Sequence, residues 1–540
     1  MPYVEGQLVD LFARTIYPAR VQFENGHITR IQALKAAPDQ YILPGFVDAH
    51  VHIESSMLVP SEFARLAVLH GSVGTVSDPH EIANVLGVKG VQFMIENGQE
   101  VPFKFNFGAP SCVPATAFES AGAVIDADGV RELLEQDDIR YLAEMMNYPG
   151  VLSQAPEVMA KLQHAKELGK VIDGHAPGLM GDKAQYYIDA GISTDHECFT
   201  YEEGLDKLQR GMKVLIREGS AAKNFDVLIP LIQDFPDKIM FCSDDKHPDD
   251  LILGHINQLV QRALAAGYDL FDVLRAACVH PVEHYGLNIG LLREQEPADF
   301  IVVDRLSQMQ VLATYIDGQL VAKNGRSLIE SVDVACLNQF NTDFKQPADF
   351  QIPAKGVNLQ VIETYDGELI TGKLTVAAKI ENGYAVSDPD RDLLKIAVVN
   401  RYQDVKPACA FIRNVGLQSG AIASCVGHDS HNIIVVGVDD TSIARAVNLI
   451  IQQKGGISVV GDGFEQVLPL PVAGIMSDKD GWQVGQSYSE IDQLARSLGT
   501  QLRAPFMTLS FMALLVIPSL KLSDQGLFDG EAFVFTDLWV

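Results

Sequence analysis

The stretch ILPGFVDAHVHIESSMLVPSEFARLAVLHGSVGTVSDPH (residues 42–80) carries the pattern that decides the fold. A short apolar run ends in polar residues, a helical segment follows, and a second apolar run again ends in polar residues. The segment between the two runs is amphipathic and begins with a serine that suits a helix N-terminus. This alternation is typical of a parallel β-sheet whose strands are joined by crossover helices.

The same alternation continues to about residue 284. Eight strand candidates lie at residues 46–50, 73–80, 103–111, 139–145, 170–175, 191–196, 213–220 and 238–244. Eight parallel strands close a TIM barrel, and the span of 45–284 is close to the roughly 250 residues that are typical of that fold. The sequence therefore predicts an α/β chain built around a TIM barrel.

The segments that flank the barrel are predicted to form two further units. Residues 1–44 alternate apolar and polar positions between turn signals, which favours short antiparallel strands. We expect strands to resume in 285–345 and to complete this N-terminal unit as a small β-sandwich. A linker-like run follows at about 345–355, and the mixed strand and helix patterns of 346–540 predict an additional C-terminal α/β domain.

Composition excludes several classes of protein. The chain has 540 residues, 47% of them apolar, and a net charge of −29, which argues against a nucleic-acid partner. The longest uncharged apolar run, 504–520, is shorter than the ~20 residues that cross a bilayer and contains two prolines, so we expect buried core and no membrane association. Seven scattered cysteines without a CxxC pair, and a start without signal-peptide features, predict a cytoplasmic protein.

Residue types that bind metals fall at the ends of the predicted strands, where the working residues of a TIM barrel lie. His50 and His52 are two positions apart at the end of the first strand, so their side chains point to the same side. Core packing gives no reason for histidines to end three separate strands. The candidate ligands are His50, His52, Glu144, His175, His196 and Asp244.

Six ligands are more than one tetrahedral ion uses, so we expect two divalent metal ions that share Glu144 as a bridge. The set contains no thiolate, which suits Mn²⁺ or Fe²⁺ and leaves Zn²⁺ as an alternative. The eighth strand ends in two adjacent aspartates, Asp244 and Asp245, and either is placed to be the ligand.

The motifs occur in an order that resembles the bacterial adenine deaminases of the amidohydrolase superfamily. In chain order they are PGFVDAHVHIESS, SDPHEIANVLG, FGAPSCVPAT, LAEMMNYPGV, DGHAPGL, STDHEC, IREGSAAKN and SDDKHPDDL. The resemblance extends into the C-terminal third through GHDSHNIIVVG and IPSLKLSDQGL. PGFVDAHVH is shared across the superfamily, whereas HIESSM, EMMNYPG and SDDKHPDDL are narrower.

The resemblance implies hydrolytic deamination of adenine to hypoxanthine and ammonia, a purine-salvage reaction in which metal-bound hydroxide attacks C6. It implies that Glu144 replaces the carboxylated lysine that many amidohydrolases carry on strand four. It favours Asp244 over Asp245, because the superfamily aspartate commonly follows a residue such as Ser243. We expect Asp244 to accept the proton of the nucleophile and to pass it to the departing nitrogen.

Other residues near the strand ends are candidates for catalysis or substrate binding. His80 and Glu81 are expected to shuttle protons or to contact the ring; the alternative is a helix N-terminus in which Asp78 caps and Pro79 begins the helix. Contacts to purine nitrogens are expected after strand seven, with surface ion pairing as the alternative. The candidate substrate-binding residues are Glu54, Arg217, Glu218, Ser220 and His247.

Two further pairs have less direct roles. Cys112 and Cys198 lie near strand ends without an obvious base, so we expect buried structural thiols. His428 and His431 in GHDSHN have no further ligands beside them in the sequence. We expect them to hydrogen-bond between domains, over the barrel mouth.

Three other functions compete with adenine deamination. The nearest is an amidohydrolase that acts on another aminated heterocycle or on a cyclic amide. A non-catalytic scaffold would lack ligands, and none is missing here. A zinc-dependent nucleic-acid deaminase would need a P-C-x-x-C motif, which the chain does not contain. We also expect the protein to form a homo-oligomer.

Overall fold

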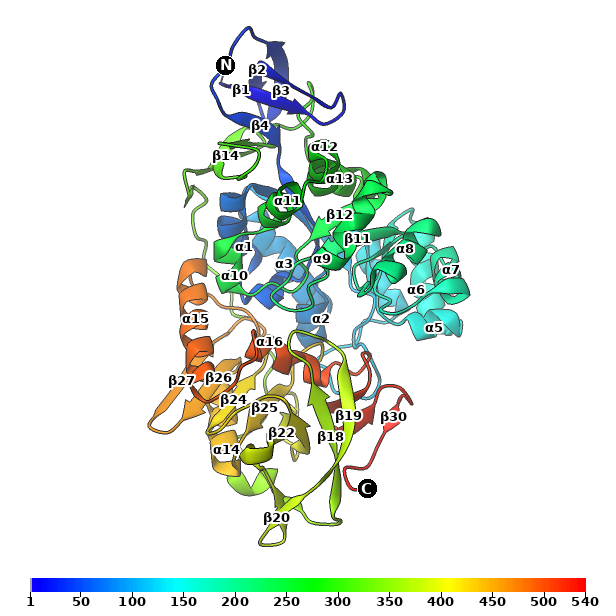
Figure 1. The fold of residues 1–540 in the computed structure, drawn as a ribbon, viewed down its shortest axis with the longest axis vertical. Coiled ribbons are helices and arrows are strands. Elements are labelled where there is room, and N and C mark those ends of the chain that lie inside the picture. The colour runs from blue at the N-terminus through cyan, green and yellow to red at the C-terminus, as the bar shows by residue number, and fades with distance from the viewer. Residues whose placement is uncertain (1) are drawn as a thin grey trace.

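The computed structural model describes residues 2–540. In Figure 1 the first strands of the chain lie at the top together with β14 (Val311–Ile316), the helices of the barrel lie in the middle, and the residues beyond about 346 form the lower part. The N-terminus and the C-terminus therefore lie at opposite ends of the long axis. The C-terminal part is referred to below as the cap region, residues 346–540.

The upper part is one eight-stranded sheet that combines both flanks of the barrel, in the order β16-β15-β14-β13-β4-β1-β2-β3. The other strands are β1 (Tyr3–Asp10), β2 (Thr15–Glu24), β3 (His27–Ala33), β4 (Tyr41–Pro44), β13 (Phe300–Val303), β15 (Gln319–Lys323) and β16 (Arg326–Ser327). The rings of Phe23 on β2 and Tyr315 on β14 are 5.6 Å apart. In a flat sheet these strands would lie ~19 Å apart, so the sheet curls until its two halves face each other as in a sandwich.

Eight parallel strands form the barrel, as the sequence predicts. They are β5 (Phe46–Val51), β6 (Ser72–Ser77), β7 (Lys104–Ala109), β8 (Ile139–Met145), β9 (Val171–Gly174), β10 (Thr194–Asp195), β11 (Lys213–Arg217) and β12 (Ile239–Cys242). β5 to β9 pair in order, as do β10 to β12. A parallel bridge between Val51 and Asp244 joins the first strand to the end of the eighth, and the Asp244 N–H donates to the His50 carbonyl over 2.9 Å.

Helices follow the barrel strands and cover the outside of the sheet (Figure 1). They are α1 (Pro60–Ala67), α2 (His80–Leu86), α3 (Val88–Gln99), α4 (Ala127–Leu134), α5 (Tyr148–Leu152), α6 (Pro156–Glu167), α7 (Gly181–Asp189), α8 (Tyr201–Gln209), α9 (Phe225–Leu228), α10 (Pro248–Leu253), α11 (Ile256–Ala265), α12 (Leu270–Leu274) and α13 (His280–Tyr285).

The helical pattern after the eighth strand is interrupted between α10 and α11. His255 lies at the break, and its buried side chain lies between the barrel strands and α1, with its ring 5.6 Å from that of Phe63. Its Nε2 lies 2.8 Å from Asp48 on β5, and its Nδ1 lies 2.6 Å from the Ser72 hydroxyl on β6. These two polar contacts hold the side chain against the barrel strands, and the backbone leaves helical geometry at this residue.

The cap region is built on a second eight-stranded sheet, in the order β19-β18-β23-β22-β25-β24-β26-β27. These strands are β18 (Asn358–Thr364), β19 (Thr371–Ala377), β22 (Leu393–Val399), β23 (Ala408–Arg413), β24 (Ala421–Ser424), β25 (Ile433–Gly437), β26 (Gly456–Gly461) and β27 (Phe464–Pro469). The smaller strands are β17 (Ile352–Pro353), β20 (Lys379–Glu381), β21 (Tyr384–Val386), β28 (Leu520–Ser523), β29 (Gly526–Asp529) and β30 (Val534–Phe535).

Three helices complete the cap region: α14 (Asp440–Gln453), α15 (Gly481–Ser497) and α16 (Pro505–Ser510). α15 packs against α1 and α10 of the barrel, as Figure 1 also shows. α16 belongs to the apolar run 504–520, most of which is buried as expected. Among residues 2–540, no helix combines the length and the apolar character that crossing a membrane requires.

The run at 345–355 differs from the expected linker. It contains β17 and a short 3₁₀ turn at Pro347–Phe350, and Phe350 is buried in a core shared with α14. Lys345 donates its backbone N–H to the Asn448 side chain on α14 over 2.8 Å. Asn448 also donates to the Lys345 carbonyl over 2.9 Å, so this polar segment is held against the helix.

Candidate active site

The six expected ligands converge at the carboxyl ends of the barrel strands, with Glu144 of β8 at the centre. Its Oε1 lies 3.4 Å from His52 Nε2. Its Oε2 lies 2.8 Å from His175 Nδ1 and 3.1 Å from His196 Nε2. One carboxylate thus contacts imidazoles from three different strand ends, as a group bridging two ions would.

Asp244 approaches the same group from the end of β12. Its Oδ1 lies 3.2 Å from His52 Nε2 and 3.6 Å from His50 Nε2. The backbone of Asp244 has a φ of 53°, a left-handed conformation that aspartate and asparagine adopt more readily than most residues. None of the six residues is more than 5% exposed, so their charges and lone pairs have little access to solvent.

The donor set fits divalent cations. His50, His196 and Asp244 offer atoms within 4.8 Å of one another, and Glu144, His175 and His196 do the same. The Nε2 atoms of His50 and His52 lie only 3.2 Å apart. Two imidazole nitrogens at this distance need a proton or a cation between them, and the surrounding oxygens and nitrogens are ligand types that Mn²⁺, Fe²⁺ and Zn²⁺ accept.

Electrostatics lead to the same conclusion. Burial, with the neighbouring rings of His196 and His52, holds the pKa of His50 well below its ordinary value, so this ring is neutral, the form that binds metals. Burial opposes a charge on His196, but the hydrogen bond and the negative charge of Glu144 outweigh it and raise the pKa of His196 to about 9. The carboxylates of the cluster therefore attract positive charge, which bound cations would supply.

Arg217, expected to contact substrate, pairs with acids behind the cluster instead. Its guanidinium contacts Asp244 and Glu197, and its Nε donates to the Ala222 carbonyl over 2.7 Å. Burial opposes the charge on Asp244, but Arg217 and the nearby imidazoles hold the pKa of Asp244 well below its ordinary value. Arg217 thus keeps Asp244 ionised and fixes its second oxygen.

His80 lies at the start of α2, beside the cluster. The helix begins at His80 itself, one residue later than the alternative reading of this segment places it. His80 Nδ1 lies 3.1 Å from Asp78 Oδ2 and 3.5 Å from Glu144 Oε1. Burial opposes a positive charge here, but Asp78 and Glu81 raise the pKa of His80 well above its ordinary value.

Glu81 connects the barrel to the cap region. Its carboxylate contacts His428 Nδ1, and its other oxygen lies 2.5 Å from His431 Nε2. Burial opposes the charge on Glu81, but His428 and His431 hold its pKa well below the ordinary value. The two histidines of GHDSHN thus contact the barrel mouth from the cap region, across more than 300 residues of chain.

Three expected substrate-binding residues have other partners. Ser220 donates to Asp250, and its hydroxyl accepts the His247 N–H over 2.9 Å. The His247 ring packs on Tyr488 of α15. The remaining residue, Glu218, pairs with a surface arginine, Arg262, over 2.8 Å. β11 ends at Arg217 rather than at 220, so Glu218 and Ser220 lie beyond the strand, and His247 lies at the start of α10. None of the three is among the described residues that line the cavity over the cluster.

Glu54 lies behind the site. Its Oε1 accepts the Ile82 N–H of α2 over 3.1 Å, and burial raises the pKa of Glu54 to about 7. The structure therefore places Glu54 where it supports α2, next to His80 and Glu81. Asp245, the other aspartate of the eighth strand, accepts the Ser55 hydroxyl over 2.6 Å and faces the cavity beside Asp244.

A cavity of about 20 Å³ lies directly over the cluster. The barrel contributes all of the expected ligands except His50, together with His80, Glu81, Glu197, Asp245 and Met146. The cap region contributes Leu369, His428, Asp429, Phe511 and Leu514. The space is no larger than about one water molecule, so a purine would enter only when the cap and barrel walls separate.

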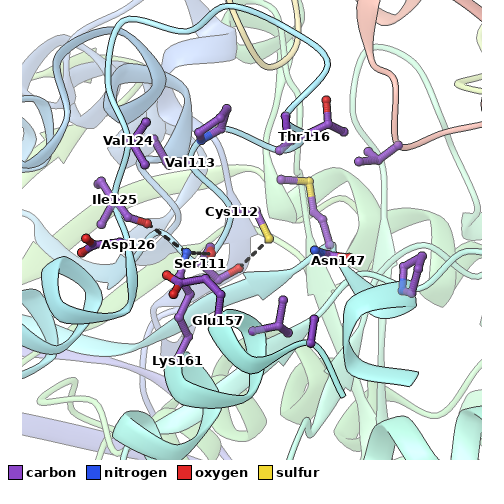
Figure 2. Close-up of a pocket in the computed structure, with 18 of the residues that line it drawn as sticks. Ser111, Cys112, Val113, Thr116, Val124, Ile125, Asp126, Asn147, Glu157 and Lys161 are labelled. Atoms are coloured by element: carbon purple, nitrogen blue, oxygen red, sulfur yellow. Dashed lines mark hydrogen bonds between the residues drawn. The ribbon is translucent and has the colours of Figure 1, made fainter. Parts of the chain in front are cut away.

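A larger pocket of about 680 Å³ lies next to this cavity and shares Met146 with it. Figure 2 shows it among the loops that follow β7 and β8, with Lys161 donating to the Ser111 and Ile125 carbonyls over 2.9 Å each. The Cys112 thiol lies in the wall, and burial raises its pKa. Cys112 and Cys198 are both buried, as expected for structural thiols.

Sequence reasoning missed several residues of the site. Glu197 directly follows His196 at a strand end, so its position could have identified it. Asp429 lies inside the GHDSHN motif, between His428 and His431. Leu369, Phe511 and Met146 are apolar, and apolar residues that line a site look like core residues in a sequence.

Comparison with known proteins adds the family. Residues 41–321 match the amidohydrolase family, and residues 368–534 match the adenine deaminase C-terminal domain. The chain is 58% identical to an adenine deaminase of Salinibacter ruber and 57% identical to one of Sulfurovum sp., in each case over 99% of both chains. It is 46% identical to an adenine deaminase of Borreliella burgdorferi over 99% of both chains. The chain therefore belongs to the adenine deaminase family of amidohydrolases.

Proposed function

We propose that the protein deaminates adenine by hydrolysis, giving hypoxanthine and ammonia for purine salvage or adenine catabolism. The observation that carries this proposal is the buried cluster of imidazoles and carboxylates at the barrel mouth, closed over by the cap region. Whole-length relatives named adenine deaminase support the choice of substrate.

The residues that would hold two divalent ions are His50, His52, Glu144, His175, His196 and Asp244, with Glu144 shared between them. Bound there, divalent ions lower the pKa of water and so make a nucleophile available at neutral pH. We propose Mn²⁺ or Fe²⁺, with Zn²⁺ as the alternative, because the set combines imidazole and carboxylate without thiolate.

Asp244 is the proposed general base and acid. It takes a proton from the attacking water as the oxygen adds to C6, and it returns that proton to the amino nitrogen as the C6–N bond breaks and ammonia leaves. Its geometry supports this role, because Arg217 fixes one oxygen while the other faces the imidazoles of the cluster.

His80 and Glu81 are proposed to complete the proton path and to contact the ring. His80 lies between Asp78 on one side and Glu81 on the other, with Nε2 3.6 Å from Glu81 Oε1. This arrangement can hold a proton on the imidazole of His80 while the charge at C6 of the purine changes. Glu54 supports the same helix through its bond to the Ile82 N–H.

The proposal is tested by metal analysis together with an adenine assay on the purified protein. We expect two divalent ions per chain, ammonia release from adenine, and the absorbance change to hypoxanthine. Turnover of a different aminated heterocycle or a cyclic amide, with none for adenine, would favour the alternative amidohydrolase activity.

Location and assembly are also part of the proposal. The described cysteines are all free thiols, which supports a reducing compartment such as the cytoplasm. A homo-oligomer stays a prediction, and light scattering of the purified protein measures it directly.

A further inference from the structure

The wall of the cavity opposite the metal cluster comes from the cap region. Leu369 and Leu514 contribute apolar surface, and the ring of Phe511 stacks on His428 with centroids 5.2 Å apart and planes at 21°. A flat aromatic surface beside two leucines suits a planar heterocycle. Asp429 is the acidic group that the cap region adds to this wall.

The Asp429 carboxylate is buried but not fully paired. The residue is 2% exposed, and its Oδ2 has no hydrogen-bond partner among residues 2–540. Its Oδ1 lies 3.7 Å from His80 Nε2 and 3.9 Å from His428 Nδ1, both longer than an ordinary hydrogen bond. Buried polar atoms in proteins are nearly always paired, so this carboxylate is available to accept a hydrogen bond from a molecule in the cavity.

Adenine carries a suitable donor on its far side. Besides the amino group, the free base has one ring N–H, which in the major tautomer is on N9 of the five-membered ring. When C6 faces Asp244 and the imidazoles, the five-membered ring points away from the cluster, toward the cap wall. In a nucleoside or an N9-alkylated purine, a bond to carbon replaces this hydrogen.

We propose that Asp429 accepts the ring N–H of adenine and thereby makes the cap region select the free base over nucleosides and N9-alkylated purines. The inference rests on the proposed function and names the recognition group of that same site. An analogue without the N–H leaves the buried carboxylate unpaired, and sites built around such a bond reject the analogue strongly.

The neighbouring acid, Glu119, is protonated at neutral pH. Burial raises the pKa of Glu119 to about 8, and the negative charge of Asp429 contributes to that rise. Glu119 Oε1 accepts hydrogen bonds from the Thr116 N–H and hydroxyl at 3.2 and 3.0 Å. At neutral pH Glu119 therefore holds its proton and adds no negative charge beside Asp429.

The test compares adenine with 9-methyladenine on the metal-loaded, full-length protein. For the wild type we expect kcat/KM for adenine to exceed that for 9-methyladenine by on the order of 10³-fold or more. In Asp429→Ala we expect kcat/KM for adenine to fall about ten- to hundredfold, mostly through KM, while 9-methyladenine changes little. Where 9-methyladenine is turned over too slowly, its inhibition constant against adenine gives the same comparison.

Two further variants control for folding. Asp429→Asn keeps the shape of the side chain and one oxygen that can still accept, so we expect a smaller fall in the same direction. Asp524→Asn is the matched control, because Asp524 is a buried acid of the cap region whose oxygens already accept from the Ser120 N–H and Asn400 Nδ2. We expect Asp524→Asn to have the same ratio of kcat/KM for adenine to kcat/KM for 9-methyladenine as the wild type. We expect all three variants to have the metal content of the wild type.

Each contrary outcome has a distinct meaning. An unchanged ratio of adenine to 9-methyladenine in both Asp429 variants would overturn the inference and leave Asp429 a structural role. Loss of metal from these variants would overturn it in favour of a metal ligand. If the wild type releases no ammonia from adenine, the proposed function fails and the inference fails with it. If the wild type turns over adenine but the Asp429 variants leave the ratio of adenine to 9-methyladenine unchanged, only the inference fails.

Discussion

Asp244 combines two local requirements that a single substitution can separate. It has a left-handed φ of 53°, which asparagine also tolerates, and its carboxylate is paired with Arg217 and the imidazoles. Asp244→Asn keeps the backbone and an oxygen for the cations but removes the group that accepts a proton. We expect turnover to fall by roughly 10²–10⁴-fold, with unchanged metal content by elemental analysis. Wild-type turnover in this variant contradicts the assigned role.

The direction of a side chain could be predicted from the sequence at the end of a strand, where strand geometry fixes it. It could not be predicted in the loops that follow. His50 lies on β5 and His52 follows directly after the strand ends at Val51, and their Nε2 atoms lie 3.2 Å apart, as the spacing of two residues predicts. Glu218 and Ser220 lie beyond the end of β11, where the chain turns and strand alternation no longer applies. Asp429 approaches from a separate sheet, and no sequence spacing relates it to residues of the barrel.

At the scale of elements, the cap wall depends on one buried lysine of β28. Lys521 donates to the Leu369 carbonyl over 2.5 Å and to the Phe511 carbonyl over 3.0 Å, so it holds together two segments that line the cavity. Burial lowers the pKa of Lys521 to about 7 from an ordinary value of 10.5. Its contribution to stability therefore depends on pH.

The sign of that dependence follows from proton binding. Between pH 7 and 10.5 the unfolded chain holds a proton on Lys521 that the folded protein has lost. Folding is therefore favoured as pH rises through this window, by about 1.4 kcal/mol per pH unit, and the penalty of the buried charge is complete below pH 7. We expect the free energy of unfolding of the wild type to rise relative to Lys521→Met between pH 7 and 9, measured by denaturant titration. Parallel pH curves for the two proteins contradict this.

The loop between β24 and β25 is expected to dock through its histidines. His431 Nε2 lies 2.5 Å from Glu81 at the start of α2, and the side chain is 1% exposed. In His431→Ala, loss of this contact should increase hydrogen exchange both in 425–432 and in α2. His284→Ala is the control, because its contact with Ser193 lies elsewhere in the barrel. Unchanged exchange in α2 would show that the contact does not couple the two regions.

The helices and strands could be predicted from local periodicity, but their contacts with residues distant in the sequence could not. All eight barrel strands follow from apolar runs that end in polar residues, and the helical pattern places α6 and α14. His255 at the helix break contacts Asp48 and Ser72, and Phe350 packs in a core formed by residues distant in the sequence. Such contacts depend on tertiary structure, which a local pattern does not contain.

At the scale of the whole molecule, the buried cluster of imidazoles and carboxylates connects the barrel to the cap region. The buried acids of the cluster repel one another unless cations or protons neutralise them, and the chain as a whole already carries a net charge of −29. Glu81, His428 and Asp429 extend the same network into the cap. Metal binding should therefore stabilise both parts of the protein together.

Metal removal tests this coupling. A ligand present at about 100 times its dissociation constant stabilises the folded state by about 2.7 kcal/mol, so treatment with a chelator should lower the thermal midpoint by several degrees, and added Mn²⁺ should restore it. Chelation should also increase hydrogen exchange around residues 425–432, because the cap wall packs over the cluster. His175→Ala removes one expected metal ligand, whose Nδ1 lies 2.8 Å from Glu144, and the midpoint of this variant should respond less to either treatment. A wild-type midpoint that is the same with chelator and with Mn²⁺ would show that the buried acids are neutralised by protons alone, and the metal centre would then have to be abandoned.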